Sequence, residues 1–373
     1  MNVLLGSWLT RLPDLQLRLQ LTEGQLGVSL LGLPLGALVG NAWSRYWLAR
    51  YRVGQVAFIG IHLMMAGVLL LSTAFSMYSI LVCLFLVGVA DGATNVAMNT
   101  TADTLERRYR MQIMSSCHGM FSLGGFVGAI CGGLASSIGL PLPWQMLILA
   151  LGLAFFLNRY RRYVWKVSTI PSASDPEQPK RLGWQRIQIL LWPALIGFCI
   201  MIGEGAISDW SPLFMRQERA SGPLLAAMAY GGFSFFMALG RFSGDRIRQR
   251  ASATQLLNGG TLLGLAGLVI ALGLPWAWTG LLGFSLAGLG FSIVVPVLFS
   301  LAARLVPHRP DQGIAFIANT AVVGFLMAPP TIGFLAEHFG LRIALSLLIG
   351  LTLIAWIGTR MLAQRVKAGR ATP

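Results

Sequence analysis

The sequence predicts an all-α membrane protein made of two similar six-helix halves. Three observations predict it: an apolar composition, a series of apolar runs long enough to cross a bilayer, and a repeat that relates the two halves. Hydrophobic residues fill 55% of the 373 positions and charged residues only 11%, whereas a soluble chain would be about a quarter charged. The composition therefore excludes an ordinary soluble enzyme, and also a disordered chain, which would be poor in apolar residues.

The apolar runs predict the individual helices, because a helix needs about 20 mostly apolar residues to cross the hydrocarbon core. Eleven runs reach or nearly reach this length, at 25–43, 54–73, 78–103, 112–137, 142–160, 187–210, 222–243, 253–274, 277–302, 312–336 and 342–362. A twelfth run, 1–9, covers about half of the core at ~1.5 Å per residue. We therefore expect twelve helices, with the chain beginning inside a shortened first one.

The basic residues predict the orientation of these spans. Most of the 28 Lys and Arg residues lie after alternate spans, in the segment 161–186 and at the C-terminus. By the positive-inside rule these parts face the cytoplasm, and we expect a bacterial-type inner membrane. The net charge of +15 does not indicate a nucleic-acid partner, because the basic clusters lack interleaved stacking aromatics. The Pro-containing segment 161–186 is predicted to be a cytoplasmic linker between bundles 1–160 and 187–373.

The two halves align on each other at a nearly constant offset. Four landmark pairs keep it: Gly88 and Gly288, Gly40 and Gly240, Gly139 and Gly340, and Trp8 and Trp210, at offsets of 200, 200, 201 and 202. Two six-helix halves related by an axis along the membrane normal are the architecture of one class of transporters, which bind their substrate between the halves near the bilayer midplane. The repeat therefore predicts a transporter with a central binding site.

One motif carries a resemblance to a family. The segment Gly240–Arg246, with Arg250 beyond it, resembles the loop signature of the major facilitator superfamily between the second and third helices of a half. The resemblance implies the fold of that superfamily, and a role in conformational change for Gly240, Arg241, Asp245 and Arg246. The first-half copy keeps a basic residue at Arg45 but has no acidic residue.

Further segments resemble one branch of that superfamily, the fucose-permease-like sugar transporters, including the rhizopine-permease branch. They are Trp8–Pro13, Asp91–Asn95, His118–Phe121, Glu204–Gly205 and Asp209–Trp210. The resemblance implies that the substrate is a sugar or a sugar-like solute.

Polar residues inside the apolar runs are the candidate site residues, because an ionisable group in a span costs several kcal/mol and is functional by default. Asp91 lies near the middle of its run, and Asn95 and Asn99 follow at helical spacing, so the three form one polar stripe. Asp91 is our first candidate for proton coupling, and the two Asn residues are candidates for substrate binding. The alternative for the Asn residues is hydrogen bonding across a helix–helix contact.

Both halves place a polar residue at one symmetric position, His118 in the first half and Asn319 in the second, 201 positions apart. We assign both to substrate binding. A histidine could also exchange protons near neutral pH, and the alternative is a purely structural hydrogen bond.

Glu204 lies between two glycines, with Asp209 and Trp210 beyond it. We predict Glu204 as the second proton-coupling residue and Asp209, Trp210 and Trp8 as substrate-binding residues, because an aromatic ring offers a flat apolar surface to a sugar face. Asp209 could instead lie at the outer interface, and the Trp residues could belong to an interfacial belt.

These observations predict a secondary transporter that moves a small polar solute by alternating access, coupled to protons because no GxxxxGK[ST] nucleotide motif is present. We expect a monomer in the lipid bilayer, with the solute and H⁺ as partners and no cofactor, metal or enzymatic activity. The alternatives are a proton-driven antiporter for efflux of drugs or metabolites, and a membrane sensor or scaffold that does not transport.

Overall fold

The structure is a computed structural model that describes residues 1–111, 113–167 and 184–367, and these residues form helices joined by short turns. The first half contains α1 Asn2–Leu9, α2 Leu12–Leu19, α3 Glu23–Leu30, α4 Gly32–Arg50, α5 Val53–Ser72, α6 Met77–Tyr109, α7 Met114–Ser137, α8 Leu142–Arg159 and α9 Arg161–Val164. The second half contains α10 Trp184–Gln217, α11 Pro223–Arg248, α12 Ala253–Gly273, α13 Ala277–Phe291, α14 Val294–Leu305, α15 Pro310–Phe339 and α16 Leu341–Lys367. The predicted all-α fold of two six-helix bundles is confirmed.

Eleven stretches of the described helices are long and apolar enough to cross a membrane, which confirms the eleven predicted long spans. Several helices extend beyond the apolar runs that predicted them: α4 reaches Arg50, α6 reaches Tyr109 and α10 reaches Gln217. The extension of α6 is mostly polar, whereas that of α10 includes the buried Leu213, Phe214 and Met215. The backbone therefore stays helical beyond the predicted runs. Most of the predicted linker, residues 168–183, lies outside the described residues.

The repeat in the sequence corresponds to a repeat in the packing. A Cβ atom on Gly88 would collide with the carbonyl oxygen of Leu33, and a Cβ atom on Gly288 would collide with that of Phe233. Gly288 follows Gly88 by 200 positions, and Phe233 follows Leu33 by the same number. In both halves, therefore, a glycine lets two helices approach at backbone distance, and the two bundles are pseudo-symmetric.

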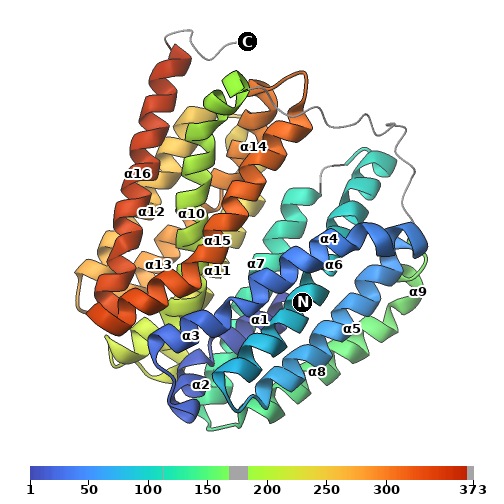
Figure 1. Cartoon of the computed structure of the whole chain (residues 1–373), viewed down its shortest axis with the longest axis vertical. Coiled ribbons are helices and arrows are strands. Elements are labelled where there is room, and N and C mark those ends of the chain that lie inside the picture. The colour runs from blue at the N-terminus through green and yellow to red at the C-terminus, as the bar shows by residue number, and fades with distance from the viewer. Residues whose placement is uncertain (112, 168–183, 368–373) are drawn as a thin grey trace.

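The two bundles meet differently at their two ends. In Figure 1 they diverge toward the end where the C-terminus lies, which we call the linker end. At the other end, the closed end, α3 packs against α15 and α2 contacts α10. A Cβ atom on Gly27 would lie 2.6 Å from the carbonyl oxygen of Pro329, and the Gln217 side chain donates a hydrogen bond to Gln16 at 3.1 Å. In between, α7 packs along α11.

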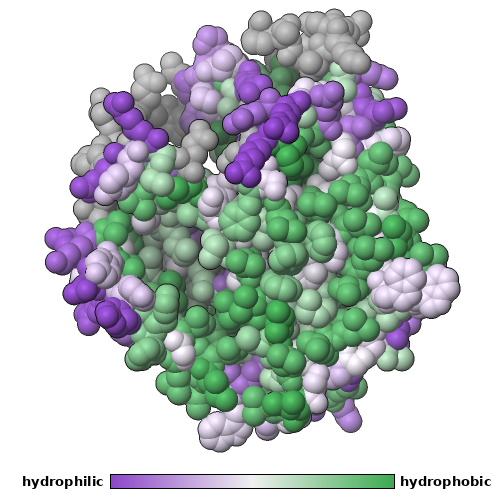
Figure 2. Space-filling view, turned by 180° about the vertical axis from the view of Figure 1, so that it is seen from behind, coloured by the Kyte–Doolittle hydropathy of each residue, from purple (hydrophilic) through white to green (hydrophobic). Residues whose placement is uncertain are grey.

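The outer surface has the polarity that a bilayer requires. On the face seen in Figure 2, apolar side chains cover a broad middle zone, and hydrophilic side chains gather mainly at the linker end and along one flank. Exposed apolar side chains such as Leu63, Phe155 and Ile343 belong to the membrane-spanning helices. In a bilayer they face acyl chains rather than water.

Candidate functional site

A cavity of about 420 Å³ lies between the two bundles and receives side chains from both. Its polar lining consists of Asn2, Asn41, Asp91, Asn95, His118, Ser122, Glu204, Ser208, Asp209, Tyr230, Ser234 and Arg241. Its apolar lining includes Trp8, Leu30, Leu33, Phe233 and Phe325. The cavity is large enough for a small ligand. It is lined by six of the nine residues predicted for proton coupling and substrate binding: Trp8, Asp91, Asn95, His118, Glu204 and Asp209.

The polar stripe of α6 reaches this cavity in part. Gly88 and Gly92 pack against α4 at backbone distance, and Asp91 and Asn95 line the cavity. The Oδ1 atom of Asp91 is buried and has no hydrogen-bond partner among the described residues. Asn99 lies outside the lining and donates a hydrogen bond to Oδ1 of Asn95 at 2.7 Å. Asn99 therefore orients the Asn95 side chain from outside the cavity.

Arg241 of α11 connects three helices at one edge of the cavity. Its guanidinium lies 3.4 Å from the Glu204 carboxylate of α10, with both side chains 18% exposed. It also donates to Oγ of Ser122 at 2.8 Å and to the carbonyl oxygen of His118 at 3.4 Å, both on α7. Ser115 of α7 in turn donates to the Arg241 carbonyl at 2.8 Å. Arg241 therefore joins an acidic residue of its own bundle to a helix of the other bundle.

Asp209 lies in the cavity wall and not at the outer interface, because α10 continues two more turns to Gln217. Tyr230 of α11, which is buried, lines the same cavity as Asp209 and Glu204. The second bundle thus contributes two carboxylates and a phenol to the cavity.

The two pseudo-symmetric tryptophans have different surroundings. Trp8 of α1 lines the cavity, although it is only 1% exposed. Trp210 of α10 is fully buried and does not line the cavity, although both rings belong to the same hydrophobic core. The indole N–H groups of both have no hydrogen-bond partner among the described residues.

A second hollow of about 550 Å³ adjoins the cavity and extends toward the linker end, between α7, α11 and α14. The two spaces share four lining residues: His118, Met201, Glu204 and Arg241. Glu106, which also lines the second hollow, accepts hydrogen bonds from the backbone N–H groups of Ile113 at 2.6 Å and Met114 at 2.7 Å, and so fixes the start of α7. Among the described residues, no group of His, Cys, Asp and Glu has the arrangement of a metal site.

Other predicted residues lie away from both spaces. Asn319 is exposed on α15 and lines neither of them. Arg45 on α4 and Arg246 on α11 are exposed. Gly240 packs against Ser292, where a Cβ atom would collide with the serine hydroxyl. The segment Gly240–Arg246 is helical within α11, and the Asp245 side chain lies outside the described ones.

Sequence reasoning missed the cavity side of α11. Tyr230, Ser234 and Arg241 lie four and seven positions apart and all line the cavity. This spacing puts them on one helix face, so a polar stripe was readable from the sequence. The predicted span 222–243 includes Arg241, but the resemblance to the superfamily's loop signature gave this residue a conformational role and not a place in the cavity.

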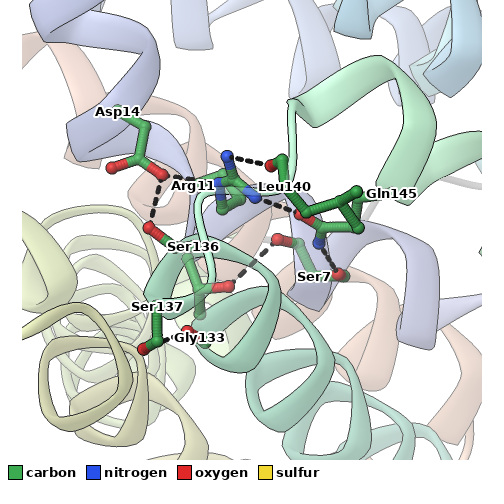
Figure 3. A network of polar contacts seen from close by, with 9 residues as sticks. Ser7, Arg11, Asp14, Gly133, Ser136, Ser137, Leu140 and Gln145 are labelled. Atoms are coloured by element: carbon green, nitrogen blue, oxygen red, sulfur yellow. Dashed lines mark hydrogen bonds and ion pairs between the residues drawn. The ribbon is translucent and has the colours of Figure 1, made fainter.

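A second buried network lies at the closed end and is shown in Figure 3. Arg11, between α1 and α2, forms an ion pair with Asp14 at 2.5 Å and donates to the side chain of Gln145 and, at 3.0 Å, to the Leu140 carbonyl. Ser136 donates to Asp14 at 2.7 Å. All these partners belong to the first bundle, so the network fixes the break between α1 and α2 against α7 and α8 without facing the cavity.

The fold and the cavity define a multi-pass membrane transporter with a central site between two six-helix bundles. The family model "Major Facilitator Superfamily" matches residues 6–329, and the chain belongs to this superfamily. Membrane protein MosC of Rhizobium meliloti is 28% identical over 358 residues, covering 95% of this chain and 85% of MosC. An uncharacterized MFS-type transporter of Yersinia pestis is 28% identical over 346 residues, covering 91% of this chain and 87% of that protein.

Solved structures of transporters share the fold. A bacterial homolog of the human lysosomal transporter Spinster, in an inward-facing and occupied conformation, gives a TM-score of 0.71 at 14% identity and covers 97% of this chain and 94% of its own. The nucleoside transporter NupG gives 0.71 at 14% identity, with 97% and 96% covered. The fucose:proton symporter FucP of E. coli gives 0.61 at 16% identity, with 96% and 95% covered.

Proposed function

We propose that this transporter moves a small hydroxylated solute, a sugar or a sugar-like compound, by alternating access coupled to protons. The observation that carries the proposal is the central cavity, where carboxylates, amides and hydroxyls from both bundles converge beside the Trp8 ring. Hydroxyl-rich solutes need several donors and acceptors at fixed positions, together with an apolar surface for the ring face.

The proposed orientation places the linker end in the cytoplasm. The basic residues of the α4–α5 and α11–α12 turns and of α9 lie at this end, in keeping with the positive-inside rule. The cavity connects toward this end through the second hollow, whereas α3 and α15 close the other end. In this orientation the structure is the inward-open state of the transport cycle.

The proposed proton carrier is Asp91. It forms no ion pair among the described residues, and its Oδ1 atom is buried without a hydrogen-bond partner. Burial of this kind favours the neutral form of a carboxyl group, so a proton can be loaded and released as access to water alternates. Glu204 is the second candidate, because the Arg241 guanidinium already neutralises its charge.

The proposed solute contacts are Trp8, Asn95, His118 and Asp209, which all line the cavity. Two of the similar structures are titled a fucose:proton symporter and a nucleoside transporter, and both fucose and nucleosides contain hydroxylated sugar rings. Asn99 contributes through Asn95. Trp210 and Asn319, which do not line the cavity, have no direct contact role in this proposal.

The proposal is tested with purified protein in liposomes. Sugars and inositol-like compounds are screened by thermal shift, because a ligand that binds only the native state raises its stability. Uptake of each hit is then measured with and without an imposed pH gradient. We expect Asp91→Asn to exchange solute across the membrane but to lose pH-driven accumulation. Asp311→Asn, a matched change at an exposed position on α15, keeps both activities. Full accumulation by Asp91→Asn would overturn the assignment of the proton carrier.

A second candidate is proton-driven efflux of an amphipathic drug or metabolite, which the apolar wall of the cavity favours. Leu30, Leu33 and Phe325 line this wall, and such surfaces bind apolar groups of different shapes with low selectivity. Everted vesicles separate the two candidates: efflux predicts accumulation of hydrophobic dyes and no stabilisation by sugars. Absence of flux for both solute classes would instead indicate a protein that does not transport.

A further inference from the structure

Four cationic side chains converge at the linker end of the first bundle, away from the transport cavity. A hollow of about 370 Å³ is lined by Asn158, Arg159, Arg161, Arg162, Trp165 and Lys166. The segment covers the last turn of α8, the helix break at Tyr160 and all of α9. Because the chain turns here, cations that are close in sequence surround one space.

The cations are held in place by aromatic and backbone contacts. The Arg161 guanidinium lies 4.8 Å from the ring centroid of Trp165 and 5.8 Å from that of Phe58 on α5. Arg162 donates to the Tyr163 hydroxyl at 2.9 Å. The backbone N–H of Gly54 on α5 donates to the Val167 carbonyl at 3.1 Å, which anchors the segment to the bundle. The hollow is therefore a built feature of the fold.

Within the part of the chain that the structure describes, none of the four cations forms an ion pair with a carboxylate. The hollow thus concentrates positive charge, and no described carboxylate neutralises it. An anion that enters it meets several donors at once, and charge-assisted hydrogen bonds from Arg are the strongest of this kind.

The position of the hollow, at the edge of the apolar surface of α8, favours one kind of anion. Just before it, α8 exposes Phe155 at 77% and Phe156 at 62%, and Tyr160 and Tyr163 are exposed beside it. Apolar and aromatic side chains give way to cations over one helical turn, as they do where acyl chains end and headgroups begin. A phospholipid has an anionic phosphate for the hollow and acyl chains for the Phe155–Phe156 surface, whereas a soluble anion has only the first.

We propose that the hollow formed by the end of α8 and α9 binds the headgroup of an anionic phospholipid, with the acyl chains lying along α8. Basic pockets between helices at the membrane surface recognise lipid headgroups through this combination of charge and depth. The site is separate from the transport cavity, so the inference does not depend on the proposed substrate.

Native mass spectrometry of the detergent-purified protein, titrated with dioleoyl phosphatidylglycerol or phosphatidylcholine, tests the proposal. We expect wild-type protein to bind phosphatidylglycerol about tenfold more tightly than phosphatidylcholine. The triple variant R161Q/R162Q/K166Q reduces this preference to about twofold. The matched control R50Q/R304Q/R360Q removes the same number of charges from exposed positions on other helices and keeps the preference. The charge-conserving R161K/R162K variant retains most of it.

Two results would overturn the proposal. Equal losses in the triple variant and its control would indicate diffuse attraction to a basic surface. Displacement of phosphatidylglycerol by millimolar inorganic phosphate or glycerophosphoglycerol would indicate a site for a soluble anion. Circular dichroism and size-exclusion elution check that each variant is folded, and R162Q/K166Q, which keeps the Arg161 packing, serves in place of a triple variant that fails this check.

Discussion

Two Arg–carboxylate pairs lie inside this transporter, and their surroundings differ. At the closed end, Arg11 is 6% exposed, lies 2.5 Å from Asp14, and is bound to partners on α8 and on the turn that precedes it. At the cavity, Arg241 lies 3.4 Å from Glu204, and both side chains are 18% exposed, whereas the Asp14 side chain at the closed end is 29% exposed. The first pair has a buried arginine whose partners all lie within one bundle, whereas the second borders the cavity and its arginine reaches across to the other bundle.

The difference teaches how one kind of ion pair can fix a structure in one place and allow it to change in another. A buried charge whose partners all lie in one rigid unit cannot rearrange without leaving a charge unpaired, which is costly. A longer pair at a cavity can exchange partners with water, solute or a proton at lower cost. We therefore expect the Arg11 network to determine stability and the Arg241 network to determine transport.

The largest effect is expected for Arg241→Gln. The substitution leaves the Glu204 carboxylate without its cation and removes the donors to Ser122 and to the His118 carbonyl. Initial transport rates in liposomes should fall about a hundredfold, because losing one partner of such a pair costs several kcal/mol. The double variant Arg241→Gln with Glu204→Gln, which removes both charges, should recover part of the rate. If the rate loss of the double variant, expressed as a free energy, equals the sum of the losses of the two single variants, the two residues act independently.

The next effect is expected for Arg11→Gln, and it concerns stability. The substitution leaves the partly exposed Asp14 without its cation and removes the donors to the Gln145 side chain and the Leu140 carbonyl, which should cost about 2–4 kcal/mol. The apparent Tm in detergent should fall by about 5 °C or more. Transport per folded molecule should change little. Arg11→Lys should restore only part of the stability, because an ammonium lacks the planar fork of donors. An Arg11→Gln protein with normal Tm and no transport would reverse the assigned roles of the two pairs.

The spans were predictable from the sequence because hydropathy over about 20 residues is a local property. The repeat was predictable too, since glycines at helix contacts, such as Gly88 and Gly288, recur at one offset. The ends of α6 and α10 lay beyond the predicted runs, because the last turns of α6 are polar and the end of α10 contains Pro212 and finishes in Arg216 and Gln217. Helical backbone persists there through hydrogen bonds that do not depend on side-chain hydropathy.

The cavity was predictable in part, from the cost of polar groups inside spans. This rule identified Asp91, Glu204 and Asp209, and it needs no knowledge of neighbouring helices. It did not distinguish Trp8 from Trp210, which are equivalent in the repeat although one lines the cavity and the other is enclosed in the core. That distinction depends on which helices pack around each ring, and a repeat in the sequence does not contain this information.

A smaller effect is expected where the two bundles close on each other. Gly27→Ala places a methyl group 2.6 Å from the Pro329 carbonyl and 3.1 Å from the Gly333 Cα atom, so α3 and α15 must separate. We expect a severalfold lower yield of crosslinking between cysteines introduced at Leu17 and Ala220, which line one surface hollow at this end, in a background without native cysteines. Gly152→Ala on α8, where no atom lies within 4 Å of the added carbon, is the control. Unchanged crosslinking in Gly27→Ala would mean that the contact yields without opening the closed end.

The smallest effects come from a matched pair of serines that tests the comparison most directly. Ser136→Ala removes one hydrogen bond to Asp14 at the closed end, and Ser122→Ala removes one from Arg241 at the cavity. Ser136→Ala should cost about 1 kcal/mol of stability and leave transport unchanged. In Ser122→Ala, the Arg241 guanidinium keeps Glu204 and the His118 carbonyl as partners, so Tm should stay constant. Its transport rate should change about two- to threefold, because α7 and α11 lose a link between the bundles. Equal losses of Tm in both variants would show that the two networks have the same structural role.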